Sequence, residues 1–403
     1  MNRISHKISS IKPSATMAMD TKAKEMIARG VNVINFGVGE PDFNTPDYIK
    51  QAAIQAIYDN FTRYTAAAGI PELRKAIAAK LESDNHLKYQ PEEILVAPGG
   101  KIVISTILTA ICNPGDEVII PVPYWVSYPV QVELADGIPV FLEATKATDL
   151  KITANQLDNL LSSLKKPKVL ILNSPNNPTG AVYSQAELTQ IAEVCQKHDI
   201  LILSDEIYEK LIYDGEKHYS IAQVSADIKK RTIVINGVSK AYAMTGWRLG
   251  YAAGPIEIIK ATVNILSQTA SCVNSITQKA AVAALTREDG STERMRREFE
   301  KRRDFIVTEI NQIPHVSCIR PKGAFYTMVD ISYYLQNNDK GITNTSDLCL
   351  YLLEKAQISL VTGSAFGMEN FVRFSYANSL ENIKEGLIRF RTGLADLLPK
   401  SGK

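Results

Sequence analysis

Residues 232–253 read TIVINGVSKAYAMTGWRLGYAA and contain the most informative side chain of this chain, Lys240. The apolar stretch 232–236 predicts a strand, and the segment after it, with its glycine and serine, predicts a turn. Lys240 lies in this turn, and Arg248 follows it, just before a second apolar stretch at 250–253. The sequence therefore places a lysine and an arginine near the ends of two expected strands.

A third charged residue, Asp205, closes the apolar stretch 200–204 upstream. Taken singly, Lys240 could be a surface lysine and Asp205 a helix cap. Together with Arg248 they suit pyridoxal phosphate, because the lysine can form an imine with its aldehyde, the arginine can hold its phosphate and the aspartate can keep its pyridine nitrogen protonated. Burial and the nearby Arg248 would both lower the pKa of Lys240 and favour the reactive amine.

Short apolar stretches alternate with helical patterns between residues 94 and 255. Strands are expected at 94–96, 117–121, 139–142, 168–173, 200–204, 232–236 and 250–253, and helices at 46–60 and 184–198. This alternation predicts an α/β fold whose large domain has a mainly parallel seven-stranded sheet covered by helices. Ligands bind such sheets beyond the carboxyl ends of the strands, where Asn173, Asp205 and Lys240 fall.

The last hundred residues have a different pattern, which predicts a smaller α+β domain. A charged helix is expected at 292–312, strands at 323–330 and 371–376, and further helices at 346–356 and 379–396. A short strand from Ile34, running into a loop, is expected before the first large-domain helix. We expect three parts: an N-terminal arm with part of the small domain (1–46), the large domain (47–290) and the small C-terminal domain (291–403).

The composition is that of an ordinary globular protein, with 403 residues, 45% hydrophobic and 22% charged. The net charge of +2 offers no basic field for nucleic acid. The five cysteines are scattered, which predicts reduced thiols, and the five histidines show no metal-binding spacing. No secretory signal and no membrane-spanning stretch is visible, so we expect a cytoplasmic protein without metal, nucleic-acid or membrane partners.

Two further polar residues follow expected strands. Asn177 lies in the loop 173–180, NSPNNPTG, which could be only a turn but whose two prolines also make a rigid platform. Tyr208 comes three residues after Asp205, near enough for its hydroxyl to reach the same ligand. We interpret both as groups that contact the cofactor's phenolic oxygen, O3′.

A glycine pair at 99–100 opens an expected helix and is followed by Lys101. The amides of a helix N-terminus bind phosphate, although two glycines alone could form a simple turn. Trp125 could belong to the core or stack on a pyridine ring. Arg373, flanked by apolar residues in an expected strand, could form a structural ion pair or bind a substrate carboxylate through two parallel hydrogen bonds.

Nine motifs in order resemble one family over essentially the whole chain. They are KPSAT at 12–16, GEPDF at 39–43, GIPELR at 69–74, GGK at 99–101, PYWVSYP at 123–129, NSPNNPTG at 173–180, SDEIY at 204–208, SKAYAMTGWR at 239–248 and VRFSY at 372–376. The chain resembles the class I (fold-type I) pyridoxal-phosphate-dependent aminotransferases, and is most similar to the bacterial-type (subgroup 1β) aspartate aminotransferases.

The resemblance implies a role for each site residue. Lys240, Asp205 and Tyr208 would be catalytic. The cofactor-binding residues would be Lys240, Gly100, Lys101, Trp125, Asn177, Asp205, Tyr208, Ser239, Arg248 and, from a partner subunit, Tyr64. The substrate-binding residues would be Gly39, Lys101, Trp125, Asn177, Arg373 and, again from the partner, Ser14 or Thr16. A homodimer with shared active sites is therefore implied.

The implied reaction is transfer of the amino group of L-aspartate to 2-oxoglutarate, giving oxaloacetate and L-glutamate. Its substrates are amino acids and 2-oxo acids. An alternative in the same family is glutamate/aspartate–prephenate aminotransferase activity, on which Lys12 would bear. Two further alternatives are a pyridoxal-phosphate-dependent lyase and a regulator that binds the cofactor without turnover.

Overall fold

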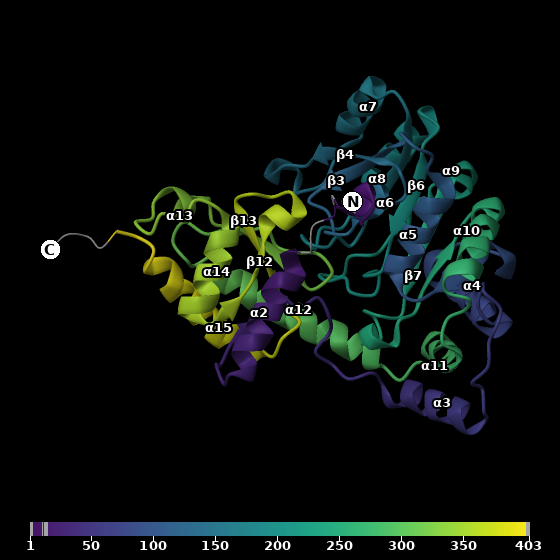
Figure 1. The fold of residues 1–403 in the computed structure, drawn as a ribbon, viewed down its shortest axis with the longest axis horizontal. Coiled ribbons are helices and arrows are strands. Elements are labelled where there is room, and N and C mark those ends of the chain that lie inside the picture. The colour runs from purple at the N-terminus through teal and green to yellow at the C-terminus, as the bar shows by residue number, and fades with distance from the viewer. Residues whose placement is uncertain (1–2, 10, 12–14, 400–403) are drawn as a thin grey trace.

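The computed structural model describes residues 3–9, 11 and 15–399, and a seven-stranded sheet forms the centre of its larger part (Figure 1). The strands are β2 (Ile94–Ala97), β3 (Glu117–Val122), β4 (Ile138–Glu143), β5 (Pro167–Asn173), β6 (Leu201–Asp205), β7 (Thr232–Gly237) and β8 (Gly250–Ala253). Their spatial order is β2-β8-β7-β6-β5-β3-β4; β8 runs antiparallel to both neighbours and the other pairs are parallel. The predicted α/β class and mainly parallel sheet are confirmed.

Helices cover both faces of this sheet because its strands are apolar on both sides. In β7, Ile233 and Ile235 face one core and Val234 the other. One face packs against α5 (Gly100–Ile111), α6 (Tyr128–Leu134) and α10 (Ile256–Thr269). The opposite face packs against α3 (Asp47–Tyr58), α4 (Pro71–Asn85), α7 (Ala154–Ser163), α8 (Gln185–Lys197), α9 (Ala226–Arg231) and α11 (Ser275–Thr286).

The C-terminal part contains a second, four-stranded antiparallel sheet. Its strands are β12 (Val361–Thr362), β13 (Phe371–Ser375), β10 (Tyr326–Asp330) and β9 (Ser317–Cys318), in spatial order. Its helices are α12 (Ser291–Ile310), α13 (Ser332–Gln336), α14 (Thr345–Ala356) and α15 (Leu380–Ala395). A parallel pair, β1 (Ile34–Asn35) with β11 (Ile358–Ser359), joins the N-terminal region to this part.

The N-terminal helices are α1 (His6–Ser9) and α2 (Ala15–Ala28). Helix α2, purple in Figure 1, lies beside the yellow and green C-terminal elements and contacts β11 and β12. Ile34 and Phe36 belong to the same apolar core as α12, α14 and α15, whereas the helices from α3 to α11 belong to the cores of the large sheet. This distribution supports our proposed division of the chain near residues 46 and 290.

Strand ends differ from the predictions where backbone groups bind elsewhere. The strand expected at 323–330 begins only at Tyr326. The amides of Lys322 and Gly323 donate to the Gly180 carbonyl, and that of Ala324 donates to Leu211. These amides tie the C-terminal part to the loops of the large sheet, so they are not free for a strand ladder.

The five cysteines are free thiols. Within residues 3–9, 11 and 15–399, no helix combines the length and the apolarity that a bilayer crossing requires.

A buried ion pair ties α4 to the segment after β6. Lys80 and Glu209 form a salt bridge, and their side chains are only 5% and 7% exposed. Asn85 contacts both, accepting from Lys80 at 2.7 Å and donating to Glu209 at 2.9 Å. Although burial raises the pKa of Glu209, Lys80 opposes this, and the net shift holds that pKa below its ordinary value. The Glu209 carboxylate is therefore ionised at neutral pH.

We predict that Lys80→Met lowers the free energy of unfolding by about 3–5 kcal/mol, because Glu209 would remain buried without its counter-charge. Urea unfolding followed by circular dichroism measures this loss. The matched control is Lys75→Met on the exposed face of the same helix, expected to change stability by less than about 0.5 kcal/mol. Adding Glu209→Gln to Lys80→Met should recover part of the loss; equal stability of Lys80→Met and the control would contradict the prediction.

Candidate active site

A cavity of about 510 Å³ lies at the carboxyl ends of the central strands. It brings together most of the site residues expected from the sequence: Gly39, Gly100, Lys101, Trp125, Asn177, Asp205, Tyr208, Ser239, Lys240, Arg248 and Arg373. Tyr64 does not line it, and that residue is 90% exposed. Ser14 and the side chain of Thr16 lie outside the described residues, as does Lys12.

Strand register explains this convergence. β5, β6 and β7 are parallel neighbours, and Asn173 pairs with Asp205, which pairs in turn with Ile235. The side chains at and just beyond these positions therefore meet at one edge of the sheet. Lys240 lies three residues after the end of β7 at Gly237, and its Nζ donates to the Gly39 carbonyl at 2.5 Å within the same cavity.

The environment of Lys240 favours a neutral amine. No described carboxylate forms an ion pair with Lys240, and the rings of Tyr208 and Phe325 lie 5.9 and 5.8 Å from its Nζ. Burial lowers the pKa of Lys240 to about 8; Arg373 and Arg248 act in the same direction, whereas the carboxylates of Glu40 and Asp205 oppose the shift. An amine with this pKa is a competent nucleophile toward an aldehyde near neutral pH.

Asp205 is buried at the base of the cavity. Burial raises the pKa of Asp205 to about 6, while the hydroxyl of Tyr128, donating at 2.6 Å, opposes that rise. The other carboxylate oxygen accepts a longer hydrogen bond, 3.3 Å, from the Ile207 amide. A cationic ring nitrogen placed here would gain a charge-assisted hydrogen bond and would favour the ionised carboxylate.

The N-terminus of α5 offers an anion site beside Arg248. Gly99 has a φ of 91°, and a Cβ on it would lie 2.5 Å from the Arg248 guanidinium. Gly250 must likewise lack a side chain, because its Cβ would lie 2.4 Å from the Gly100 nitrogen. The glycines thus bring the arginine, β8 and the first turn of α5 together, which suits a phosphate group.

Arg373 lies on the opposite side, in β13. Its guanidinium donates to Asn177 Oδ1 at 3.0 Å and to the Gly37 carbonyl at 2.8 Å, and it is 4% exposed. Its Nε has no hydrogen-bond partner among the described residues. A buried guanidinium without a carboxylate partner is costly unless a ligand completes it, so this side of the cavity suits a carboxylate.

Lys101 adds a second cation at the cavity wall. Its Nζ lies 5.1 Å from the centre of the Trp125 ring. Burial lowers the pKa of Lys101, and Arg248 adds to this effect. The wall thus presents a point charge and a flat aromatic surface close to each other.

The residues present fit pyridoxal phosphate. Lys240 supplies an amine without a carboxylate partner, Asp205 supplies a buried acceptor, and the first turn of α5 supplies amides. No heavy atom lies within 4 Å of where a Cβ on Gly100 would stand, so this turn is open to a ligand. The amine suits the cofactor's aldehyde, the carboxylate suits its ring nitrogen and the amides suit its phosphate.

Two tyrosines of the cavity were missed by the sequence interpretation. Tyr128 donates to Asp205, and Tyr326 lies against both Tyr208 and Arg373. Tyr128 belongs to the motif PYWVSYP and Tyr326 to the strand expected at 323–330, but tyrosine is also a common core residue. Only the packing of distant segments shows where their hydroxyls point.

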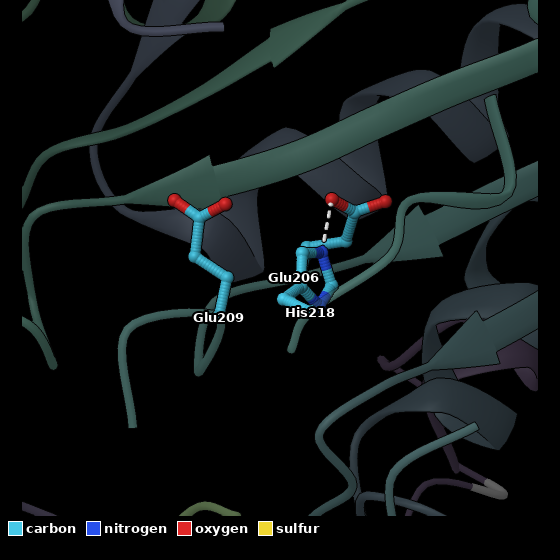
Figure 2. A group of neighbouring side chains, drawn as sticks. All are labelled: Glu206, Glu209 and His218. Atoms are coloured by element: carbon cyan, nitrogen blue, oxygen red, sulfur yellow. Dashed lines mark hydrogen bonds and ion pairs between the residues drawn. The ribbon is translucent and has the colours of Figure 1, made fainter. Parts of the chain in front are cut away.

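A separate group, Glu206, Glu209 and His218, brings three possible metal-binding atoms within 4.8 Å of one another (Figure 2). One oxygen of Glu206 accepts hydrogen bonds from two serine hydroxyls, and the other lies 2.8 Å from His218 Nε2. Glu209 is paired with Lys80, whose ammonium would repel a cation. We interpret this group as a buried charge network behind the cavity.

Comparisons with known proteins agree with this geometry. The family model described as aminotransferase class I and II matches residues 31–390. The aspartate aminotransferase of Bacillus sp. (strain YM-2) is 46% identical over 386 residues, covering 96% of this chain and 97% of that protein. The aspartate/prephenate aminotransferase of Nitrosomonas europaea is 44% identical, covering 98% and 100%. The crystal structure of the Rhizobium meliloti aspartate aminotransferase superposes with a TM-score of 0.94 at 41% identity, covering 98% and 100%.

We predict a specific pH dependence for the reaction of Lys240 with pyridoxal phosphate. With a pKa of about 8, the neutral fraction of the amine rises about tenfold between pH 7 and pH 9 and then levels off. Stopped-flow absorbance on cofactor-free protein measures the rate. A rise of about a hundredfold without levelling would indicate an ordinary lysine pKa and contradict the prediction. Lys240→Ala is the control: it lacks the amine, so the absorbance of the lysine-bound cofactor should not appear.

Proposed function

Because the chain belongs to the class I and II aminotransferases, we propose that it transfers the amino group of L-aspartate to 2-oxoglutarate, with pyridoxal phosphate held on Lys240. The observation that carries this proposal is the single cavity lined by the Lys240 amine, the buried carboxylate of Asp205 and the guanidinium of Arg373, both of which act on the pKa of Lys240. The two half-reactions yield oxaloacetate and L-glutamate and use the same site in turn.

The proposed cofactor contacts follow the walls of the cavity. Asp205 would hold the ring nitrogen, and Tyr208 with Asn177 would bind the phenolic oxygen. Gly100, Lys101, Ser239 and Arg248 would bind the phosphate, and Trp125 would cover the ring. When bound in this way, the cofactor acts as an electron sink for the substrate carbon that loses its proton.

Lys240 would move the proton. When not bonded to the cofactor, the Lys240 amine would be suited by its lowered pKa to accept a proton from the substrate Cα. The same amine would also return that proton, so Lys240 would serve as base and acid in turn. Asp205, buried and hydrogen-bonded by Tyr128, would hold its charge constant while this occurs.

The substrate would lie between two cations. Arg373 would bind the α-carboxylate, with Gly39 and Asn177 beside it, and Lys101 would bind the distal carboxylate. Two positive groups that line one cavity favour dicarboxylic over monocarboxylic substrates. The names of the relatives, which include aspartate, support this choice of substrate.

We further propose a homodimer that completes each site. Tyr64 is 90% exposed and outside its own chain's cavity, which supports a role for it in a partner's phosphate site. Ser14 or Thr16 would approach the distal carboxylate in the same way. A partner that contributes these groups makes the dimer necessary for activity.

Lys240→Ala tests the proposed chemistry. We expect turnover to fall by several orders of magnitude while the far-ultraviolet circular dichroism stays unchanged, because the amine that carries cofactor and proton is lost. A coupled assay of oxaloacetate formation measures the rate. Turnover near that of the unaltered protein would refute the assignment.

Lys101→Ala tests substrate recognition. We expect kcat/KM to fall about 10–100-fold more for aspartate than for alanine, because only aspartate has a distal carboxylate to lose its charged partner. Steady-state kinetics with both amino donors measures the difference. Equal losses for the two donors would remove Lys101 from distal-carboxylate binding.

The same assay separates the alternatives. Relatives named aspartate/prephenate aminotransferases make prephenate the first additional acceptor to compare with oxaloacetate. Release of pyruvate and ammonia would instead indicate a lyase. Cofactor binding without any amino transfer would indicate a regulator.

A further inference from the structure

Tyr326 lies where the two sheets meet the cavity. It begins β10, is 1% exposed and lines the cavity. Its hydroxyl is 2.9 Å from the hydroxyl of Tyr208, and the two rings meet edge to face at 5.8 Å. Tyr208 follows β6 of the large sheet, so this hydrogen bond joins the two sheets at the site.

Arg373 packs against the face of the Tyr326 ring. The guanidinium carbon lies 4.4 Å from the Tyr326 ring centre and 5.0 Å from that of Phe366. A cation this close to two aromatic faces gains electrostatic stabilisation, and more so where water is excluded. The ring of Tyr326 thus orients Arg373, while the hydroxyl of the same ring contacts Tyr208.

The position of Tyr326 is closely defined by its neighbours. A Cβ on Gly39 would lie 2.8 Å from the Tyr326 hydroxyl, so the substrate-side loop leaves room for that oxygen. The Phe325 ring lies 4.7 Å from the Tyr326 ring and 5.4 Å from that of Tyr208. Neither tyrosine can turn away without displacing a packed ring.

We propose that Tyr326 is a positioning residue that acts on Tyr208 through its hydroxyl and on Arg373 through its ring. It thereby couples the state of the bound cofactor to recognition of the substrate carboxylate. This inference rests on the proposed function, in which Tyr208 contacts the cofactor's phenolic oxygen and Arg373 contacts a carboxylate.

A proton count sets the direction of the hydrogen bond. Burial raises the pKa of both Tyr208 and Tyr326, so each is a neutral phenol with one proton at pH 7. When Tyr208 donates its proton to the cofactor oxygen, the 2.9 Å contact requires Tyr326 to donate to Tyr208. Two hydrogen bonds in series strengthen each other, so Tyr326 makes Tyr208 the stronger donor.

This coupling has a spectroscopic consequence. Hydrogen-bond donation to the cofactor's phenolic oxygen favours the cofactor form with one proton fewer, because that form carries more negative charge on the oxygen. Removal of the Tyr326 hydroxyl weakens the donation and shifts the pH midpoint of the visible absorbance upward. The ring face, which Phe retains, is not needed for this effect.

Tyr326→Phe tests the hydroxyl. We expect the absorbance midpoint of the cofactor-loaded protein to rise by about 0.5 pH unit. Tyr334→Phe is the matched control, because Tyr334 is buried in the same part of the chain and donates to the Pro314 carbonyl, away from the cavity. A midpoint that equals that of the control, or one that falls, would overturn the role of the hydroxyl.

Tyr326→Leu tests the ring. We expect the Kd for succinate, a dicarboxylate that cannot react, to rise about tenfold in this variant and less than about twofold in Tyr326→Phe. In kinetics, the Leu variant should mainly raise KM for both substrates, and the Phe variant should mainly lower kcat. Unchanged succinate binding in the Leu variant would overturn the role of the ring, and the Phe titration decides the hydroxyl whether or not the Leu variant folds.

These readouts separate the two proposals. Both the titration and succinate binding use the loaded protein without turnover. A protein that shows the predicted shifts but transfers no amino group from aspartate would refute the proposed reaction and retain the role of Tyr326. A protein that transfers amino groups but shows no shifts would refute Tyr326 alone.

Discussion

The burial of the Lys240 amine near two arginines, with no ion pair to a carboxylate among the described residues, is the constraint on which the rest of the site depends. Its Nζ donates to one backbone carbonyl, and Arg373 and Arg248 both add to the lowering of its pKa. Such an arrangement costs stability unless the charge is removed or a ligand supplies the missing anions. A ligand with a phosphate, a carboxylate and an aldehyde would offset this cost, because these groups would bind Arg248, Arg373 and Lys240, respectively.

This arrangement needs two parts of the chain to meet. The large sheet supplies Asp205 and Lys240, and the four-stranded sheet supplies Arg373. Two sets of contacts fix the position of these parts relative to each other. They are the backbone hydrogen bonds from 322–324 to the loops of the large sheet and the contact between Tyr208 and Tyr326. A shift of either part would therefore change the cofactor side and the carboxylate side of the cavity together.

Buried charges behind the cavity support the turn that carries Asp205 and Tyr208. Glu206 and Glu209 alternate with them in sequence but do not line the cavity: Glu206 lies beside His218 (Figure 2), and Glu209 is paired with Lys80. The segment thus alternates between groups that face the ligand and groups that anchor the backbone. A sequence pattern of acidic residues alone does not tell one set from the other, because both kinds are carboxylates near a strand end.

The sequence by itself determined the bounds of the strands of the large sheet to within one or two residues. Such strands are apolar on both faces, so each appears in the sequence as a short continuous apolar stretch bounded by turn residues. The sequence also indicated that Lys240 and Asp205 lie together, because parallel strands end at one edge of a sheet. Only the tertiary structure decided the start of β10, the partner of Asp205 and the contacts of Tyr326. These depend on which surfaces meet between segments that are far apart in the chain, and no local pattern of apolar and polar residues specifies that pairing.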